Sequence, residues 1–309
     1  MNTYSIAIHG GAGTLVKGMM TPVKETAYKQ ALQKALDSGF TILKNGGTAV
    51  NAVEAAVKAL EDSHLFNAGK GAVFTANETH EMDASIMDGK TLEAGAVSLI
   101  TGIKNPISLA RDVMEKSEHV FLAGEGAMQF AKDNNYILEN PDYFYDELRH
   151  QQWLDIKDTD RFQLDHSAKK DSKFGTVGAV ACDTKGNIAA ATSTGGMTNK
   201  RYGRVGDSPM IGAGNYANNN TCAVSCTGSG EFFIRGVVAY DVSCLIEYKG
   251  LTLAEASEEV INNRIIKIGG DGGLIAVDSK GNIEMPFNTE GMYRGIKTSE
   301  GEDLVSIYK

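Results

Sequence analysis

Residues 151–173 and residues 175–181 differ sharply in character, and the junction between them restricts the possible folds more than any other part of the sequence. The first segment is polar and lacks periodicity, which predicts a mobile linker over about residues 151–175. The second (GTVGAVA) opens with Gly175-Thr176 and continues as a small apolar run typical of a strand. A linker that leads into such a strand fits a precursor that cuts itself, although a domain boundary or an ordinary turn glycine would give the same pattern.

The two residues at this junction gain chemistry only if the chain breaks there. An internal threonine is a poor nucleophile because its hydroxyl has no base beside it. Cleavage of the Gly175–Thr176 bond would give Thr176 a free α-amine, whose ordinary pKa is roughly 7.7–8.0. That amine can take the proton of the hydroxyl near neutral pH, so one residue would supply both nucleophile and base.

Composition limits the class of protein. The 309 residues are 42% hydrophobic and 22% charged, as in soluble globular domains. The net charge of −9 and the lack of a dense lysine–arginine run argue against nucleic acid or an anionic membrane as a partner. Neither a signal peptide nor a segment of transmembrane length is visible, so we expect a cytoplasmic protein whose four cysteines are reduced and buried.

Periodicity and turn residues predict alternating elements in the first half of the chain. Thr21-Pro22 is typical of a helix start, and Gly46-Gly47 is typical of a helix end. The elements we expect, in chain order, are a strand at residues 4–9, helices that begin at residues 21 and 48, short strands within residues 71–100, and helices from residue 105 and at residues 125–133.

The second half contains a repeat. Residues 183–188 (DTKGNI) resemble residues 278–283 (DSKGNI), and each copy follows a strand-like apolar run, which indicates a hairpin. Two such hairpins predict one sheet, or a sandwich, closed by its first and last strands. Residues 231–248 and 253–261 between them have helical spacing. Strands packed under helices indicate a layered α/β or α+β architecture.

A set of motifs occurs in order along the chain: residues 9–13 (HGGAG), 65–69 (LFNAG), 175–181 (GTVGAVA), 191–197 (ATSTGGM), 203–209 (GRVGDSP), 225–231 (SCTGSGE) and 286–293 (PFNTEGMY). Together they resemble the plant-type L-asparaginase/isoaspartyl peptidase family of N-terminal nucleophile hydrolases. The resemblance runs nearly from end to end and implies an α+β fold, a four-layer αββα sandwich. It also implies cleavage into an α subunit (residues 1–175) and a β subunit (residues 176–309) that remain one folded domain, and a dimer of such αβ heterodimers.

The resemblance assigns catalytic roles that the residues alone leave open. Thr176 would be the nucleophile, and Thr194 would hydrogen-bond its hydroxyl. The Thr227 hydroxyl and the Gly228 amide would form the oxyanion hole. Without the resemblance, Thr194 and Thr227 are better explained as strand residues that satisfy local backbone groups. Self-cleavage between Gly175 and Thr176 would need no partner, catalysis would need no cofactor, and Gly10 and Gly11 are hypothesised to crowd the Gly175 carbonyl.

Arg204 and Asp207 suit the head group of a free amino acid. The planar fork of Arg204 can grip a carboxylate, and Asp207 can accept an ammonium group. A surface ion pair across a turn is the alternative, and the resemblance favours ligand binding. Gly228 and Gly230 would let the head group approach the backbone, and Asn67 is a further candidate contact. With both α groups held, the bond left to attack is the side-chain amide of L-asparagine or the isopeptide bond of a β-aspartyl dipeptide.

The resemblance also implies a structural sodium ion held by backbone carbonyls. The matching carbonyls are those of Leu60, Glu61, Ser63, Phe66, Ala68 and Lys70. Ser63-His64 stands where the family often has Cys-Pro, and the loss of the proline is expected to loosen this loop.

Other functions remain open at this point. A glycosylasparaginase or an aspartate-directed threonine endopeptidase would share the nucleophile. The lack of a visible signal peptide argues against the first, and the Arg204–Asp207 pair argues against cleavage within a chain. An uncleaved protein that binds amino acids as a sensor is the third possibility, and it differs by lacking the break at Gly175–Thr176.

Overall fold

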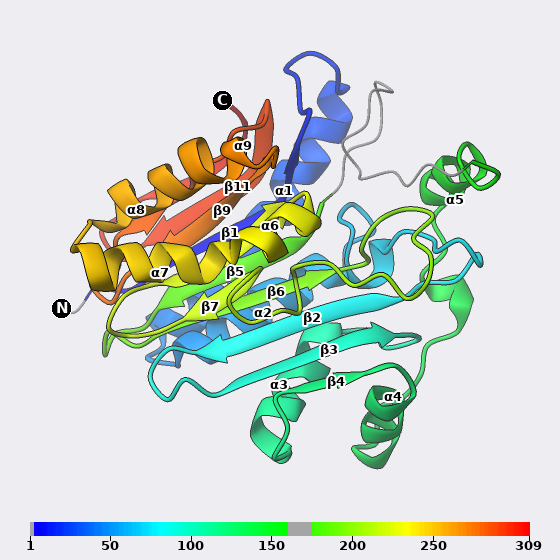
Figure 1. The fold of residues 1–309 in the computed structure, drawn as a ribbon, viewed down its shortest axis with the longest axis horizontal. Helices are drawn as coiled ribbons and strands as arrows, with labels where there is room; N and C mark the ends of the chain where they lie inside the picture. Colours follow the sequence, from blue (N-terminus) through cyan, green and yellow to red (C-terminus); the bar gives the residue numbers. More distant parts are fainter. Residues whose placement is uncertain (1–2, 160–174) are drawn as a thin grey trace.

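The computed structural model describes residues 3–159 and 175–309, and within these ranges the chain is a mixed α+β protein (Figure 1). The strands form two sheets, in the orders β12-β11-β1-β5-β6-β2-β3-β4 and β10-β9-β8-β7. Neighbouring strands are antiparallel except β3 and β4. Their bounds are β1 (Ser5–Gly13), β2 (Met82–Asp88), β3 (Ala94–Ile100), β4 (Phe121–Ala123), β5 (Val177–Cys182), β6 (Ile188–Thr194), β7 (Asn215–Ala217), β8 (Ala223–Gly228), β9 (Gly272–Val277), β10 (Ile283–Glu284), β11 (Gly291–Thr298) and β12 (Asp303–Tyr308).

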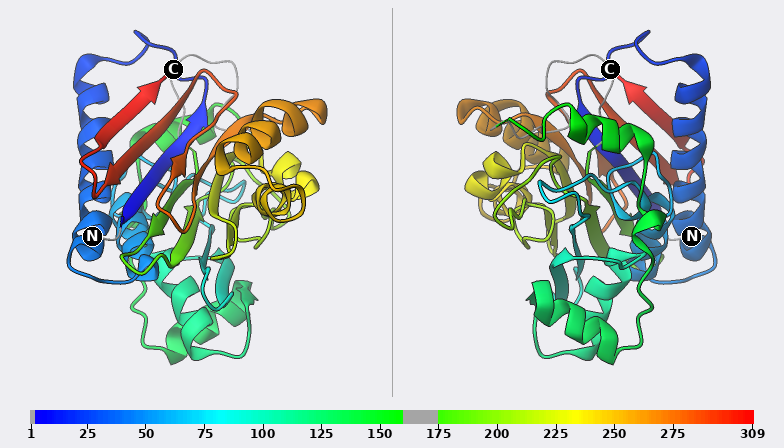
Figure 2. Two further views of the ribbon diagram at one scale, coloured as in Figure 1. Left: turned by 90° about the vertical axis from the view of Figure 1, so that its left-hand side faces the viewer. Right: turned by 90° about the vertical axis from the view of Figure 1, so that its right-hand side faces the viewer.

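The helices lie on the outer sides of these sheets, with α1 on one side and α7 and α8 on the opposite side in Figure 2. Helices α1 to α3 contact the larger sheet, and α6 to α8 contact the smaller one. The helices are α1 (Pro22–Lys44), α2 (Ala49–Glu61), α3 (Pro106–Lys116), α4 (Gly124–Asp133), α5 (Glu147–Leu154), α6 (Gly230–Gly236), α7 (Val238–Lys249), α8 (Leu253–Glu259) and α9 (Ile265–Lys267), with the 3₁₀-helices η1 (Gly69–Gly71) and η2 (Pro141–Tyr143) and the π-helix η3 (Val260–Arg264).

The two sheets pack against each other, which explains why their strands are apolar on both faces. Along β1, Ile6 and Ile8 belong to the core under the helices, whereas Ala7 belongs to the core between the sheets. Small side chains such as Ala190 and Ala223 let the sheets approach closely. The site described below lies in this layer, where side chains from both sheets meet.

The predicted helix starts are confirmed by their caps. The Thr21 hydroxyl accepts a hydrogen bond from the Lys24 amide at 3.3 Å, and Pro22 follows at the first helical position. The Thr48 hydroxyl caps α2 in the same way, through the Asn51 amide at 3.3 Å. Each bond satisfies an amide that the helix itself leaves unpaired, which is why threonine marked both starts in the sequence.

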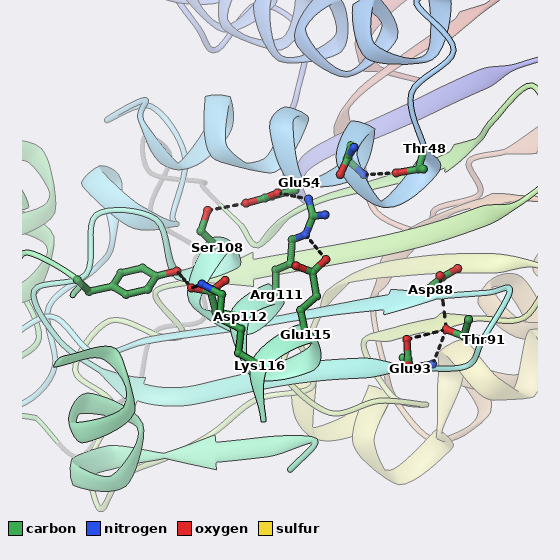
Figure 3. A network of polar contacts seen from close by, with 12 residues as sticks. Thr48, Glu54, Asp88, Thr91, Glu93, Ser108, Arg111, Asp112, Glu115 and Lys116 are labelled. Carbon is green, nitrogen blue, oxygen red and sulfur yellow. Dashed lines mark hydrogen bonds and ion pairs between the residues drawn. The ribbon is translucent and has the colours of Figure 1, made fainter. Parts of the chain in front are cut away.

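Helices α2 and α3 are joined by a polar network on the outside of the larger sheet (Figure 3). Glu54 of α2 accepts hydrogen bonds from the Ser108 hydroxyl at 2.7 Å and from the Arg111 guanidinium at 2.6 Å, both on α3. Arg111 also pairs with Glu115 at 2.8 Å. Helix α2 packs on β5 and β6, and α3 packs on β2 and β3, so the network fixes neighbouring parts of one sheet relative to each other.

The repeated hairpins are present but belong to different sheets. Asp183 and Asp278 each accept two backbone amides within their turns, so the two turns are built alike. The first joins β5 and β6 in the larger sheet, and the second joins β9 and β10 in the smaller. The last strands, β11 and β12, return to the larger sheet beside β1. A single sheet closed by both hairpins is therefore wrong, because the repeat reflects equal turn chemistry and not a shared sheet.

The expected linker begins later than residue 151. Helix α5 continues to Leu154, and Trp153 is buried. The other side chains that α5 buries are Arg149 and Gln152, so the helix shows no apolar periodicity in the sequence. The rest of the expected linker, residues 160–174, lies outside the described residues. Every helix that the structure describes is too short or too polar to span a bilayer.

Candidate active site

Thr176 lies directly before β5, opposite Thr194 at the end of β6. The register pairs Val177 with Ser193 and Gly178 with Thr192, so the next position outward sets Thr176 beside Thr194. The two hydroxyl oxygens are 3.1 Å apart, and Thr176 donates. The Ser208 hydroxyl lies 3.4 Å from the same Thr176 oxygen. The structure therefore brings the predicted nucleophile and its predicted partner together.

A buried histidine holds the backbone of Thr176. The His9 Nδ1 lies 3.0 Å from the Thr176 carbonyl oxygen, and Nε2 lies 2.9 Å from the Ser225 hydroxyl. Complete burial lowers the pKa of His9 to about 3, although the bond to Thr176 opposes the shift, so the ring is neutral. Because a carbonyl only accepts, Nδ1 carries the proton and Nε2 accepts from Ser225. Both ring nitrogens are thus engaged, one by the Thr176 backbone and the other by Ser225.

The contact between the sheets at this point depends on a glycine. A Cβ atom on Gly178 would collide with the Ser225 hydroxyl and with His9 Nε2. The Ser225 hydroxyl also lies 2.7 Å from that of Thr192, so one polar cluster links β1 and β6 of the larger sheet to β8 of the smaller. The cluster fixes the distance between the two sheets near Thr176 and Thr227.

Gly175 lies between β1 and β8. A Cβ atom on Gly11, whose φ is +109°, would come within 2.5 Å of the Gly175 Cα and nitrogen. A Cβ atom on Gly175 would lie 3.2 Å from the Thr227 hydroxyl oxygen. Gly11 thus lies close to the Gly175 backbone, whereas a Cβ atom on Gly10 would face Phe66; crowding of the Gly175 carbonyl by either glycine stays a prediction.

The Thr227 hydroxyl has the environment expected of an unused donor. Its residue is completely buried, and among the described residues its oxygen has no hydrogen-bond partner. A buried hydroxyl without a partner is costly, so such an arrangement points to a group that the site is built to receive. The adjacent Gly228 has a φ of +152°, and a side chain there would collide with the Asp271 carbonyl.

The candidate head-group site contains a buried carboxylate and an arginine. Burial raises the pKa of Asp207 to about 7, although the charge of Arg204 opposes the shift. Its Oδ2 lacks a hydrogen-bond partner among the described residues. A Cβ atom on Gly230 would lie 2.8 Å from Asp207 Oδ1 and 3.0 Å from Arg204 Nη2, so only glycine leaves this space open. Arg204 itself pairs with Glu231, through bonds of 2.8 and 2.9 Å.

Asn67 supports the loop that follows Thr194. Its amide nitrogen donates to the Gly196 carbonyl at 2.7 Å, and its amide oxygen accepts from the Val73 amide at 3.1 Å. Both ends of the side chain are thus engaged by backbone. A direct contact between Asn67 and substrate stays a prediction.

The loop between α2 and η1 brings carbonyl oxygens together. A Cβ atom on Gly69 would lie 2.5 Å from the Glu61 oxygen, and one on Gly71 would collide with the Phe66 oxygen and lie 2.8 Å from that of His64. The glycines are thus needed where the carbonyls of Glu61, His64 and Phe66 approach the backbone, and Glu61 and Phe66 are among the predicted ligands. Oxygen ligands of this kind suit a hard cation, and the sodium site stays a prediction.

Sequence reasoning missed several residues of this site. His9 and Ser225 are the first residues of two of the family motifs, whereas Ser208 and Glu231 lie at or next to the end of a motif. Only their positions in those motifs could have drawn attention to them, since their partners come from other elements. His9, Ser208 and Glu231 each contact a residue that sequence reasoning did identify, or the backbone of one, and Ser225 contacts His9.

Comparison with known proteins agrees with this geometry. The family model described as Asparaginase matches residues 2–307. The chain belongs to this family. The isoaspartyl peptidase of Escherichia coli (strain K12) is 50% identical over 100% of this chain and 97% of its own length. A probable isoaspartyl peptidase/L-asparaginase 2 of Arabidopsis thaliana is 42% identical over 100% of both chains. A plant-type L-asparaginase of Pyrococcus abyssi is 44% identical over 93% of this chain and 94% of its own. The resemblance predicted from the motifs is confirmed.

Proposed function

We propose that this asparaginase-family hydrolase acts through Thr176 after cleavage of its own chain at Gly175–Thr176. The observation that carries the proposal is the hydrogen bond of 3.1 Å from the Thr176 hydroxyl to the Thr194 hydroxyl, at the point where β5 begins and β6 ends. In the uncut chain the Thr176 nitrogen is an amide and cannot act as a base. The hydroxyl would attack the Gly175 carbonyl, and the C–N bond would break as the ester forms, which frees the Thr176 amine. Water would then hydrolyse the ester and release the Gly175 carboxylate and the Thr176 hydroxyl.

The same groups would then hydrolyse substrate. The Thr176 amine takes the hydroxyl proton as Oγ attacks the side-chain carbonyl, and it returns the proton to the departing amine. The Thr227 hydroxyl and the Gly228 amide would stabilise the oxyanion. Water then attacks the aspartyl ester and frees aspartate. Thr194 orients Oγ, and His9 fixes the backbone that carries it.

The packing supports the finer fold assignment as well. Contacts join β1 and β5 to β8 and β9, and helices cover the outer faces of both sheets. We therefore propose that the fold is a four-layer αββα sandwich. Residues 1–175 and 176–309 would both contribute to it after cleavage, since β1 pairs with β5 and β11 across the cut. Assembly into a dimer of αβ heterodimers stays a prediction from the resemblance.

The carbonyls of Leu60, Glu61, Ser63, Phe66, Ala68 and Lys70 would hold the sodium ion. The ion would stiffen the loop that presents Asn67, and through Asn67 the glycine pair after Thr194. It supplies no step of the reaction.

We expect both L-asparagine and β-aspartyl-leucine to be hydrolysed, because each presents free α groups to Arg204 and Asp207 and a side-chain carbonyl to Thr176. The α-linked isomer, aspartyl-leucine, should be inert, since its α-carboxylate is lost in the peptide bond. The measurement is kcat/KM for the three compounds, with N-acetylglucosaminyl-asparagine as a fourth. Preference for the glycosylated compound would favour a glycosylasparaginase, and binding of L-asparagine without turnover by an intact chain would favour a sensor.

The pH dependence should differ between kcat/KM and kcat. In the free enzyme, Asp207 with its pKa of about 7 must be ionised to receive the ammonium group, and the Thr176 amine must be neutral. Both conditions fail as the pH falls, so kcat/KM should decline on the acid side with a limiting slope of about two. Bound ammonium lowers the pKa of Asp207, so kcat should decline with a slope of about one. Equal slopes in profiles measured from about pH 5 to pH 9 would contradict the role of Asp207.

A further inference from the structure

Glu231, at the start of α6, occupies one edge of the Arg204 guanidinium. Its Oε1 accepts from Nε at 2.8 Å and its Oε2 from Nη2 at 2.9 Å. The arginine side chain is 20% exposed, whereas Glu231 is 50% exposed. A guanidinium has five N–H groups, and this bidentate pair uses two of them. Both N–H groups of Nη1 and one of Nη2 remain for a ligand.

The remaining edge of Arg204 borders the head-group site. A Cβ atom on Gly206 would lie 2.8 Å from Arg204 Nη1, and one on Gly230 would lie 3.0 Å from Nη2. The same Gly230 atom would lie 2.8 Å from Asp207 Oδ1. Gly230 thus keeps open a space that both Arg204 and Asp207 border, and Gly206 keeps the Nη1 side of Arg204 clear. A ligand there meets a cation and an anion on different sides.

Such a site has an inherent weakness, because Arg204 and Asp207 could neutralise each other. The charge of Arg204 acts on the Asp207 carboxyl, so the two groups are close enough to interact. In the described part of the chain, however, the ion pair of Arg204 is with Glu231 and none is formed with Asp207. Asp207 is left buried with one oxygen unpartnered. A collapsed Arg204–Asp207 pair would remove the recognition of both α groups at once.

We propose that Glu231 is a positioning residue for substrate specificity: it holds Arg204 away from Asp207 and presents the free edge of the guanidinium to the substrate α-carboxylate. Glu231 makes no contact with the reacting atoms in this scheme. The inference rests on the proposed function, since it concerns the head group of that substrate. In this scheme Glu231 carries a charge that binds neither the carboxylate nor the ammonium group of the ligand directly.

The test is steady-state kinetics of Glu231→Ala with L-asparagine and β-aspartyl-leucine. We expect KM for both to rise about tenfold or more, as for the loss of a charged hydrogen-bonded pair, with kcat changed far less. Glu231→Gln keeps one acceptor oxygen and should fall between the wild type and Glu231→Ala. Inhibition by succinate, which has a carboxylate but no ammonium, should weaken in parallel with that by L-aspartate. Self-cleavage at Gly175–Thr176 should persist in each variant, which shows that the fold is retained.

Asp241→Ala is the matched control. Asp241 on α7 forms its ion pair with Arg264, at 2.6 and 2.9 Å, and not with Arg204, so its loss should leave KM unchanged. An unchanged or lower KM in Glu231→Ala would mean that Glu231 competes with the substrate for Arg204, and would overturn the inference. So would a loss confined to kcat. A wild-type enzyme inactive on both substrates would instead overturn the proposed function. If Glu231→Ala does not fold, the same criteria apply to Glu231→Gln.

Discussion

Thr176→Ala should remain a single chain of 309 residues and should lose hydrolysis of both substrates. The substitution removes the hydroxyl that attacks Gly175, so the amine that serves as base never forms. We expect kcat/KM to fall by about 10⁴-fold or more, because nucleophile and base disappear together. Intact-mass spectrometry reports the cleavage, and ammonia release from L-asparagine reports the turnover.

Loss of the fold would not explain this result. Thr176 donates one hydrogen bond, to Thr194 at 3.1 Å, and the loss of such a bond costs about 1 kcal/mol. Thermal unfolding should therefore show a small shift only. Thr176→Ser keeps a hydroxyl at the same position and is the matched control; it should cut the chain and turn over substrate, more slowly in both cases. A Thr176→Ala protein that yields a fragment beginning at residue 177 or 176, or that retains turnover, would refute the role of Thr176.

The sequence was most informative where local chemistry decides the structure. Thr21 and Thr48 begin helices because their hydroxyls cap them, and the turns at Asp183 and Asp278 repeat because the same side-chain bonds build both. Thr176 and Thr194 were paired through the resemblance, and the register of β5 and β6 supplies the physical cause. These features depend on neighbours in sequence or on one hairpin.

The features that sequence reasoning missed depend on distant partners. His9 contacts Thr176 across 167 positions and Ser225 across 216. No local pattern separates this histidine from any other buried one. Helix α5 escaped detection because its buried face carries Arg149 and Gln152, which look solvent-exposed in a sequence. The assignment of the two hairpins to separate sheets likewise depends on packing between sheets.

Thr227→Val should lower kcat and leave the fold as stable as before or more stable. Valine has nearly the shape of threonine but no donor, so the oxyanion would lose one hydrogen bond. Loss of one such donor costs about 2.7–4 kcal/mol of barrier, or about 10²- to 10³-fold in kcat. In the resting protein, however, the buried Thr227 hydroxyl has no partner among the described residues. Its removal relieves an unpaired polar group, so the free energy of unfolding should stay the same or rise by about 1 kcal/mol.

A variant of a second buried threonine, Thr221, is the control that distinguishes a catalytic effect from a packing effect. The Thr221 hydroxyl lies 2.7 Å from the Ser243 hydroxyl, so Thr221→Val breaks an existing bond and should reduce stability while kcat is retained. Opposite responses of the two variants, measured by urea unfolding and by kcat per cleaved chain, would identify Thr227 as a donor kept for the transition state. The count of cleaved chains matters because Thr227 also lies near Gly175, where self-cleavage begins. Wild-type kcat in Thr227→Val would instead show that the oxyanion is stabilised elsewhere, because a hydroxyl that is aimed at the developing charge cannot be removed without a loss of rate.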